Sequence, residues 1–260
     1  MQLTRLRTIL SQRKELFRML VIALGVVVSA LMAAPQAATV YSAAKRKLPI
    51  YCVETDKKLV AISFDAAWGA DDTERLLGIL KEKEVLATFF LCGYWVEKYP
   101  EEVKAIAAAG HDIGNHGDTH AHGAQLDFAQ NQKEIQGVHD KIKKLLGIDM
   151  NLYRPPFGEY NNVVLEAAES LHYYAIQWNI DSLDWKNYGV EHEINQVVNH
   201  KNLSNGSIVL FHNDADFTPD ALPQIIDGLR AKGYSFVPIS DLIIKENYTL
   251  DHEGRQKPGR

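Results

Sequence analysis

Cysteine is scarce in this sequence, which contains 2 in its 260 residues, Cys52 and Cys92. Two cysteines cannot form the network of bonds that holds small secreted domains together, so a disulfide framework is excluded. Cys92 falls within an apolar run and is typical of a small core residue. Nothing in the sequence favours a bridge between the two. Internal repeats and low-complexity segments are missing as well.

A strong net charge is also missing. The formal net charge is −5, which gives no reason to expect a nucleic-acid partner. The hydrophobic content of 46% and the charged content of 23% are those of an ordinary globular protein. A length of 260 residues allows one sizeable domain with short extensions.

The N-terminal segment combines a basic leader with an apolar run. Residues 1–18 contain four arginines, one lysine and a single acid, and residues 19–34 carry no charge. This pattern predicts an export signal whose basic end stays in the cytoplasm. The apolar run is slightly shorter than the ~20 residues of a full span. We therefore expect either a single-span anchor in the cell membrane or a cleaved signal peptide, with the domain outside the cytoplasm in both cases.

From residue 57 onward, the patterns of strands and helices alternate. The expected strands are 59–64, 87–92, 110–115, 151–153, 172–178, 207–211 and 234–237, with helices at 72–84, 100–109, 128–146, 162–171, 191–200 and 221–232. About seven β-α units predict an α/β fold whose parallel sheet closes into a distorted barrel. The expected organisation is a leader (1–18), a signal anchor or signal-peptide core (19–34), a linker (35–56), one domain (57–247) and a polar tail (248–260) that is disordered from Asp251.

Polar residues follow several of these strands, where a parallel barrel brings them to one rim. They are Asp65, His116, His120, Arg154, Asp181, Asp184, Trp185 and His212. Acids, histidines and an arginine on one rim are more polar groups than packing requires, and they indicate metal-assisted hydrolysis. His116 and His120 are four residues apart, a spacing that lets two neutral imidazoles bind one divalent cation. The alternative is that these histidines are exposed loop residues.

Five motifs between about Lys57 and Lys245 resemble, in order, those of the polysaccharide deacetylase family, the NodB-homology domain of carbohydrate esterase family four. They are Ser63–Asp65, His116–His120, Arg154–Gly158, Asp181–Trp185 and Ile208–His212. The resemblance implies the distorted barrel of that family and a divalent metal, zinc or another transition metal. It also implies hydrolysis of N-acetyl groups on a cell-envelope polysaccharide, with peptidoglycan amino sugars as the first candidate.

The resemblance also implies a role for each matching residue. Asp65 would be the general base, oriented by Arg154, and His116 and His120 would bind the cation. His212, held by Asp184, would protonate the departing amine. The backbone N–H of Phe157 would help to hold the oxyanion, and Trp185 and Leu210 would wall the acetyl pocket. An amide is a poor electrophile with a poor leaving group, so its hydrolysis needs both carbonyl polarisation and amine protonation.

One position departs from the family pattern. Ala66 stands where the family has its second acid, normally the third protein ligand, and alanine cannot bind a metal. Either Asp65 binds the cation instead of acting as a base, or Asp118, Asp71 or His122 supplies the missing ligand. The alternatives in function are a catalytically impaired member that binds glycans and an O-acetyl esterase acting on another acylated glycan.

Overall fold

The computed structural model describes residues 46–259, together with Met19 and Leu24. The predicted leader (1–18), nearly all of the apolar segment (19–34) and the first part of the linker (35–45) lie outside the described residues. In the part of the chain that is described, no helix combines the length and apolar character of a membrane span. Arg46–Arg260 form one compact unit.

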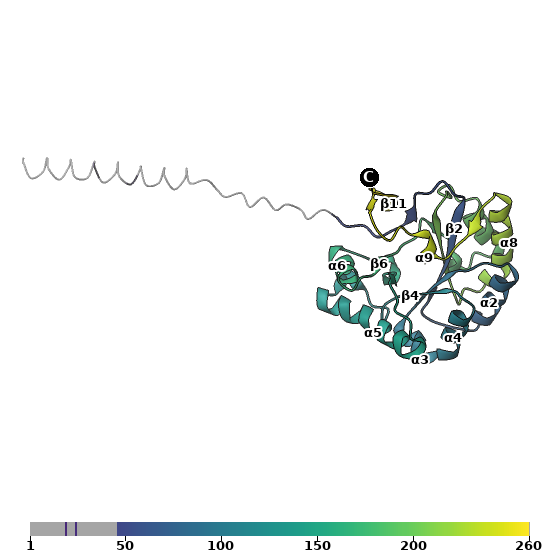
Figure 1. The fold of residues 1–260 in the computed structure, drawn as a ribbon, viewed down its shortest axis with the longest axis horizontal. Coiled ribbons are helices and arrows are strands. Elements are labelled where there is room, and N and C mark those ends of the chain that lie inside the picture. The colour runs from purple at the N-terminus through teal and green to yellow at the C-terminus, as the bar shows by residue number, and fades with distance from the viewer. Residues whose placement is uncertain (1–18, 20–23, 25–45, 260) are drawn as a thin grey trace, which may run out of the picture. The chain divides into compact units, whose positions relative to one another are not determined.

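A curled sheet, built mostly of parallel strands, lies at the centre of this unit (Figure 1). The strands are β1 (Cys52–Val53), β2 (Leu59–Ala66), β3 (Thr88–Leu91), β4 (Asp112–Asn115), β5 (Leu152–Tyr153), β6 (Tyr174–Ala175), β7 (Ile180–Asp181), β8 (Ser207–His212), β9 (Ser235–Phe236), β10 (Tyr248–Leu250) and β11 (Arg255–Pro258). The strand β2 pairs in parallel with β3 on one side and β8 on the other. The parallel ladder continues from β3 through β4 and β5 to β6, while β7 pairs with β8.

The ring is closed by a short segment before β1. Ile50 forms a parallel bridge with Ile176, which follows β6. Its N–H donates to the Ala175 carbonyl at 2.8 Å, and its carbonyl accepts from the Gln177 N–H at 2.7 Å. At the other end of this segment, β1 pairs antiparallel with β8. The predicted distorted barrel is confirmed, and part of the predicted linker is what closes it.

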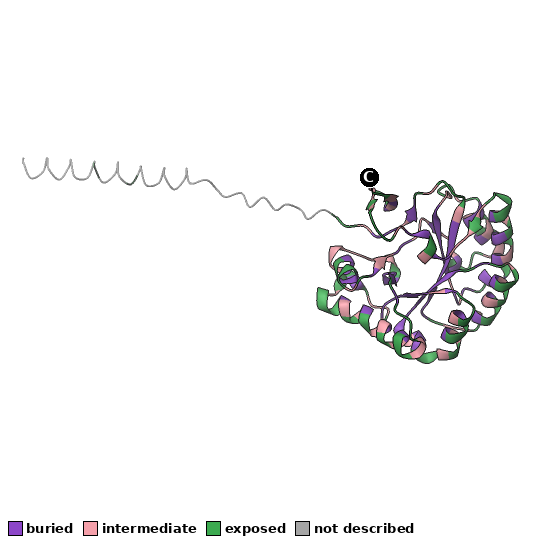
Figure 2. Ribbon diagram, viewed as in Figure 1, coloured by how far each residue is buried: buried purple, intermediate pink, exposed green. Residues whose placement is uncertain are grey.

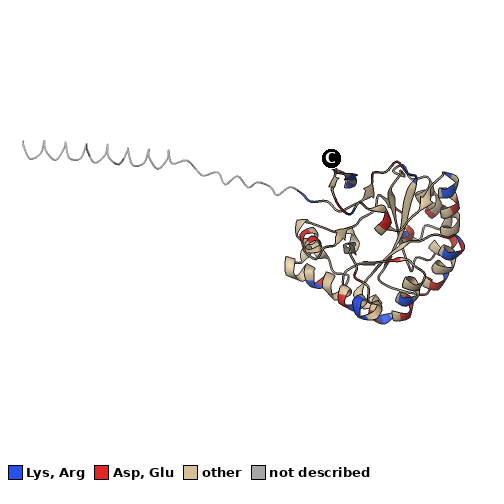
Figure 3. Cartoon of the chain, in the orientation of Figure 1, with Lys and Arg blue, Asp and Glu red and all other residues tan. Residues whose placement is uncertain are grey.

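Helices surround the sheet, with their outer faces exposed (Figures 1 and 2). They are α2 (Thr73–Glu82), α3 (Gly93–Lys98), α4 (Pro100–Ala108), α5 (Phe128–Leu146), α6 (Asn162–Ser170), α7 (Val190–Val198), α8 (Thr218–Ala231) and α9 (Ile239–Leu242). The helix α5 has the predicted bounds because its ends are encoded locally. Asp127 caps its first turn reciprocally with Gln130, and Gly147 ends it with a left-handed φ of 74°. Figure 3 shows acidic and basic residues interspersed along the outer helices.

The two faces of the sheet carry different sets of side chains. Alternate residues of β2 belong to different buried clusters, because side chains along a strand point to opposite faces. Phe64 and Ala66 belong to the cluster shared with the surrounding helices. Ala61 belongs to the cluster inside the ring. By the same alternation Ser63 and Asp65 face the interior of the ring.

The predicted disordered tail is wrong. The strand β11 pairs in parallel with β1 and antiparallel with β10. Gln256 is fully buried, and its side-chain amide pairs with both backbone groups of Ile244, at 2.8 and 2.7 Å. These contacts satisfy a buried polar side chain and order a segment whose composition is polar. Residues 248–259 therefore belong to the folded domain.

Candidate active site

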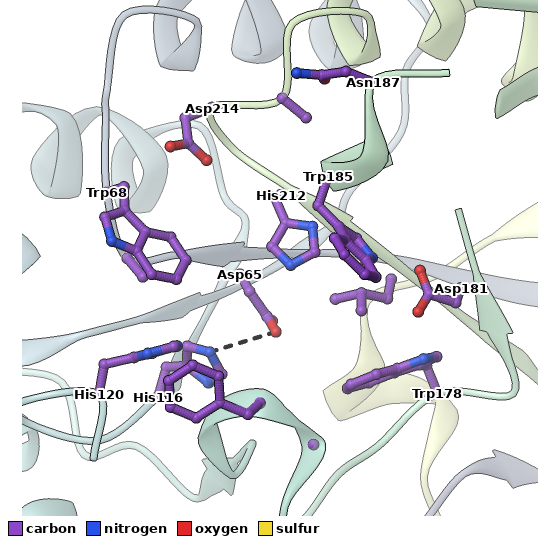
Figure 4. Close-up of a pocket in the computed structure, with 15 residues that line it drawn as sticks. Asp65, Trp68, His116, His120, Trp178, Asp181, Trp185, Asn187, His212 and Asp214 are labelled. Atoms are coloured by element: carbon purple, nitrogen blue, oxygen red, sulfur yellow. Dashed lines mark ion pairs between the residues drawn. The ribbon is translucent and has the colours of Figure 1, made fainter. Parts of the chain in front are cut away.

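A cavity of about 490 Å³ opens where the parallel strands end (Figure 4). Residues that line it include Asp65, Trp68, His116, His120, Phe157, Trp178, Asp181, Trp185, Leu210, His212 and Asp214. All but two of the predicted site residues are in this lining. The exceptions are Arg154 and Asp184, which lie buried behind the cavity wall. The parallel ladder thus brings the predicted rim residues together.

Asp65 is held by a buried arginine. Arg154 Nη1 donates to Asp65 Oδ1 at 2.7 Å, while Nη2 donates to Ser63 Oγ at 2.9 Å. The guanidinium also stacks 4.1 Å above the ring centroid of Phe90. Burial pushes the pKa of Asp65 upward, but the charge and hydrogen bond of Arg154 and the charge of His212 outweigh this and leave the pKa below its ordinary value. Asp65 is therefore ionised, with its second oxygen free of the arginine.

The two predicted metal-binding histidines converge on the cavity. His116 Nδ1 lies 2.7 Å from the carbonyl oxygen of Arg154, and a carbonyl only accepts, so this nitrogen carries the proton. The lone pair of Nε2 is thereby left available, 3.5 Å from Asp65 Oδ2. The rings of His116 and His120 lie 5.0 Å apart between centroids. Burial lowers the pKa of both histidines, that of His120 to about 4, so both are neutral.

Cys92 joins this pair, a grouping that the sequence pattern does not predict. Its thiol and one ring nitrogen of each of His116 and His120 all lie within 4.8 Å of one another. Cys92 is fully buried, as expected of a core residue, and burial raises the pKa of its thiol. It directly follows β3, whereas the sequence predicts a strand over 87–92 that includes it, so the sequence pattern does not mark Cys92 as a rim residue. Imidazole nitrogens and a thiol suit zinc or another transition metal, so these residues fit the cation of the resembled family.

The other candidates for a third ligand are engaged elsewhere or lie away from the cavity. Asp118 pairs with Lys141 at 2.5 Å. His122 pairs with Glu159 at 2.9 Å and stacks on Phe157, with 4.2 Å between ring centroids. Asp71 is exposed, and none of these three candidate residues lines the cavity.

A buried aspartate holds the histidine that ends β8. His212 Nδ1 donates to Asp184 Oδ1 at 2.8 Å, and the His212 backbone N–H donates to Asp184 Oδ2 at 2.6 Å. The same carboxylate accepts two more hydrogen bonds, from the backbone N–H of Trp185 at 2.8 Å and from the Thr218 hydroxyl at 3.2 Å. Burial lowers the pKa of His212, but the hydrogen bond and charge of Asp184, aided by Asp65 and Asp181, raise it to about 9. His212 is therefore protonated at neutral pH.

Aromatic side chains surround the polar groups. Phe157 and Trp185 are about half exposed, at 50% and 56%, as expected for residues that could contact a ligand. Trp68 and Trp178 also line the cavity, and the sequence analysis missed both. The Trp68 ring lies edge-on to His120, with centroids 4.9 Å apart. A cavity with aromatic walls, a carboxylate, two neutral imidazoles and an imidazolium can bind a sugar and exchange protons with it.

The sequence matches the family model described as Polysaccharide deacetylase over residues 53–176. The peptidoglycan-N-acetylglucosamine deacetylase of Bacillus cereus is 34% identical over 196 residues, which cover 74% of this chain and 91% of that protein. The uncharacterized protein YlxY of Bacillus subtilis is 30% identical over 195 residues, and the match spans 75% of this chain but 60% of YlxY.

Solved structures with the same fold bear on whether the site is active. Wild-type BA3943, described as a CE4 family pseudoenzyme from Bacillus anthracis, matches with a TM-score of 0.73 and 30% identity, over 76% of this chain and 69% of that one. A mutant of BA3943 described as having restored enzymatic activity also gives a TM-score of 0.73, with 31% identity over 76% of this chain and 72% of the mutant. The fold is shared by forms with and without activity, so the site residues must decide which applies.

Proposed function

Because this chain belongs to the polysaccharide deacetylase family, we propose that it is a metal-dependent hydrolase that removes N-acetyl groups from a cell-envelope polysaccharide. Peptidoglycan amino sugars are the proposed substrate. The observation that supports this best is that two oppositely charged groups, each held by a buried partner, reach the same cavity. Asp65 is held by Arg154, and His212 is held by Asp184. Figure 4 shows Asp65 and His212 in the same cavity.

Asp65 is the proposed general base. Its lowered pKa keeps it ionised, and Arg154 fixes Oδ1 so that Oδ2 remains free to accept a proton from the attacking water. A carboxylate tied to a fully buried arginine has little freedom to rotate, which keeps Oδ2 directed toward His116. Arg154 therefore acts on the reaction by orienting Asp65.

His212 is the proposed general acid. The proton on Nδ1 is engaged by Asp184, so Nε2 carries the proton that can be delivered to the departing amine. Its pKa of about 9 ensures that this proton is present at neutral pH. Amine protonation is needed because an amide nitrogen leaves poorly as an anion.

The neutral imidazoles of His116 and His120 would hold a divalent cation, zinc or another transition metal. When bound, this cation polarises the acetyl carbonyl as a Lewis acid. Phe157 has a left-handed φ of 59°, and its backbone N–H is the proposed second donor to the developing oxyanion. Trp185 and Leu210 are the proposed walls of the acetyl pocket.

A catalytically impaired, glycan-binding protein is the second candidate function. It is favoured by Ala66 and by the likeness to BA3943, which is described as a pseudoenzyme. Acetate release from peptidoglycan and from N-acetylglucosamine oligomers, measured with added zinc or cobalt, separates the two candidates. Release supports the hydrolase, whereas glycan binding without release supports the impaired member. An O-acetylated glycan in the same assay tests the O-acetyl esterase alternative.

The N-terminal segment is the proposed attachment to the cell membrane. The support is the pattern of the sequence, in which a basic leader (1–18) precedes an uncharged apolar run (19–34). On this proposal the hydrolase acts outside the cytoplasm, where the proposed substrate lies. Membrane fractionation and N-terminal sequencing of the mature protein test this proposal, since a new N-terminus after the apolar run would mean secretion rather than anchoring.

A further inference from the structure

The family has an acid at position 66, and this chain has none there. Ala66 is fully buried and belongs, like Cys92, to the cluster shared with the surrounding helices. It has no donor atom, and it is not among the residues that line the cavity. Two imidazoles alone hold a cation more weakly than the three protein ligands of typical catalytic zinc sites.

Cys92 stands directly beside Ala66, at the end of the neighbouring strand. Its backbone N–H donates to the Ala66 carbonyl at 3.0 Å. Its thiol, together with a ring nitrogen of each histidine, forms the one group of three potential metal donors found in the described residues. We propose that Cys92 replaces the missing carboxylate as the third protein ligand, so that the metal site of this chain is a Cys-His-His centre. This inference refines the metal site of the proposed hydrolase and rests on that proposed function.

The backbone fixes Cys92 against the histidine loop. His116 N–H donates to the Leu91 carbonyl at 3.0 Å, and Gly93 N–H donates to the Gly117 carbonyl at 3.1 Å. Gly93 permits this approach because a Cβ there would come within 1.8 Å of Asp118 Oδ1. The cysteine and the loop are therefore preorganised as neighbours before any cation arrives.

The donor atoms are close to the separation that a cation requires. Zinc–sulfur and zinc–nitrogen bonds of about 2.3 and 2.0–2.1 Å in a tetrahedron place the ligand atoms roughly 3.3–3.6 Å apart. The three donor atoms lie within 4.8 Å of one another, so they must approach by about 1 Å to bind one ion. Rotation of the thiol about χ1 and a small shift of the partly exposed His120 ring would supply it, and the thiol would give up its hydrogen bond to the His116 carbonyl, which is 3.3 Å long. On binding, the sulfur–hydrogen bond breaks, a metal–sulfur bond forms, and the proton passes to the solvent.

This assignment keeps Asp65 available as a base. Arg154 already holds one of its oxygens, and the carboxylate is not part of the three-donor group. Both histidines line the cavity whereas Cys92 does not, so a cation held by these three residues would be reached from the cavity. A thiolate is a soft ligand, so the centre should favour zinc or cobalt over magnesium or calcium.

The test is a cobalt(II) titration followed by absorption spectroscopy, because a thiolate bound to cobalt gives a near-ultraviolet charge-transfer band that carboxylate and imidazole do not. Four proteins are compared: the unmodified chain, Cys52→Ala as the matched control, Cys92→Ala, and Cys92→Ala with Ala66→Asp. We expect the band in the first two only. Affinity for zinc, measured against a competing chelator, should fall at least ~10-fold in Cys92→Ala, since loss of even an outer partner costs ~10–100-fold. Ala66→Asp should recover part of that affinity without the band.

Several outcomes would overturn the assignment. They are cobalt binding without the band in Cys52→Ala, no cobalt binding at millimolar concentration, and unchanged zinc affinity in Cys92→Ala. If Cys92→Ala does not fold, as judged by circular dichroism, the Cys52→Ala spectrum decides alone, because Cys92 is then the remaining cysteine of the chain. If the band appears but no acetate is released, the Cys-His-His centre stands and the proposed hydrolase activity is rejected. If acetate is released but the band is missing, the hydrolase activity stands and Cys92 is rejected as a ligand.

Discussion

The pairing of Asp184 with His212 sets the alkaline limit of the proposed activity. Asp184 is the main influence that raises the pKa of His212 to about 9, against the lowering effect of burial. In Asp184→Asn the imidazole keeps its burial but loses its anionic partner, so its pKa should fall to about 6.5, the ordinary histidine value, or lower. The general acid would then be deprotonated over most of the neutral range.

The size of the effect follows from the protonated fraction of His212. At pH 7.5 a pKa of about 9 leaves about 97% of the imidazole protonated, whereas a pKa of about 6.5 leaves about 9%. The expected loss in kcat/KM is therefore about 10-fold at pH 7.5 and about 75-fold at pH 8.5, from protonation alone. Because the pKa is raised in the folded state, the same pairing also stabilises the fold fully below about pH 6.5, and this contribution is lost as the pH rises through about 9.

The assay is the pH profile of kcat/KM for acetate release, which reports the ionisation of the free enzyme. Asp181→Asn is the matched control, because Asp181 lies nearby but is the smallest contributor to the raised pKa of His212. The alkaline limb of the pH profile should move much less in Asp181→Asn than in Asp184→Asn. An alkaline limb that stays near pH 9 in Asp184→Asn, in a protein whose thermal stability is retained, would refute the assignment of His212 as the acid.

Three further predictions follow from the same cavity. His212→Ala should lower kcat by ~10²–10⁴-fold with little change in KM, because proton delivery is needed mainly in the transition state; unchanged kcat in acetate release would contradict this. Arg154→Leu should lower the free energy of unfolding by ~3–5 kcal/mol, since it leaves Asp65 buried without its cation, and a loss below ~1 kcal/mol in urea denaturation would argue against that pairing. Ala66→Asp should lower the melting temperature of the metal-free protein, because it buries a carboxylate. Added zinc should restore the melting temperature. A melting temperature that does not change with zinc would mean that the new carboxylate does not reach the ion.

The sequence was most informative where structure is encoded locally. Helix α5 could be predicted to the residue because Asp127 and Gly147 mark its ends. The convergence of Asp65 and His212 could be predicted because both end parallel strands, and the carboxyl ends of such strands meet at one rim. In these cases a few residues at the ends of a helix or strand determine the arrangement.

Long-range pairings could not be predicted in this way. Neither the partner of Ile50 nor that of Gln256 is marked by any nearby residue, so the sequence predicts a linker for the closing segment and a disordered tail for the last strands. The sequence predicts a core residue at Cys92, which it is, because burial and metal binding place similar demands on a cysteine. Distinguishing them requires the position of the thiol relative to two histidines that lie over 20 residues further along the chain.

The closure of the ring by Ile50 and the pairing of β1 with β11 have a consequence for the order of events during synthesis. The partner of Ile50 is Ile176, and Cys52 pairs with Arg255, so the segment around β1 cannot pair until residues far along the chain have been translated. Such non-local contacts are formed slowly, because the chain entropy of closing the intervening loop is lost before the contact is gained. We expect the nascent domain to remain unclosed, with exposed strand edges, until β11 has emerged. A chain that is exported unfolded would have this delay built into its topology.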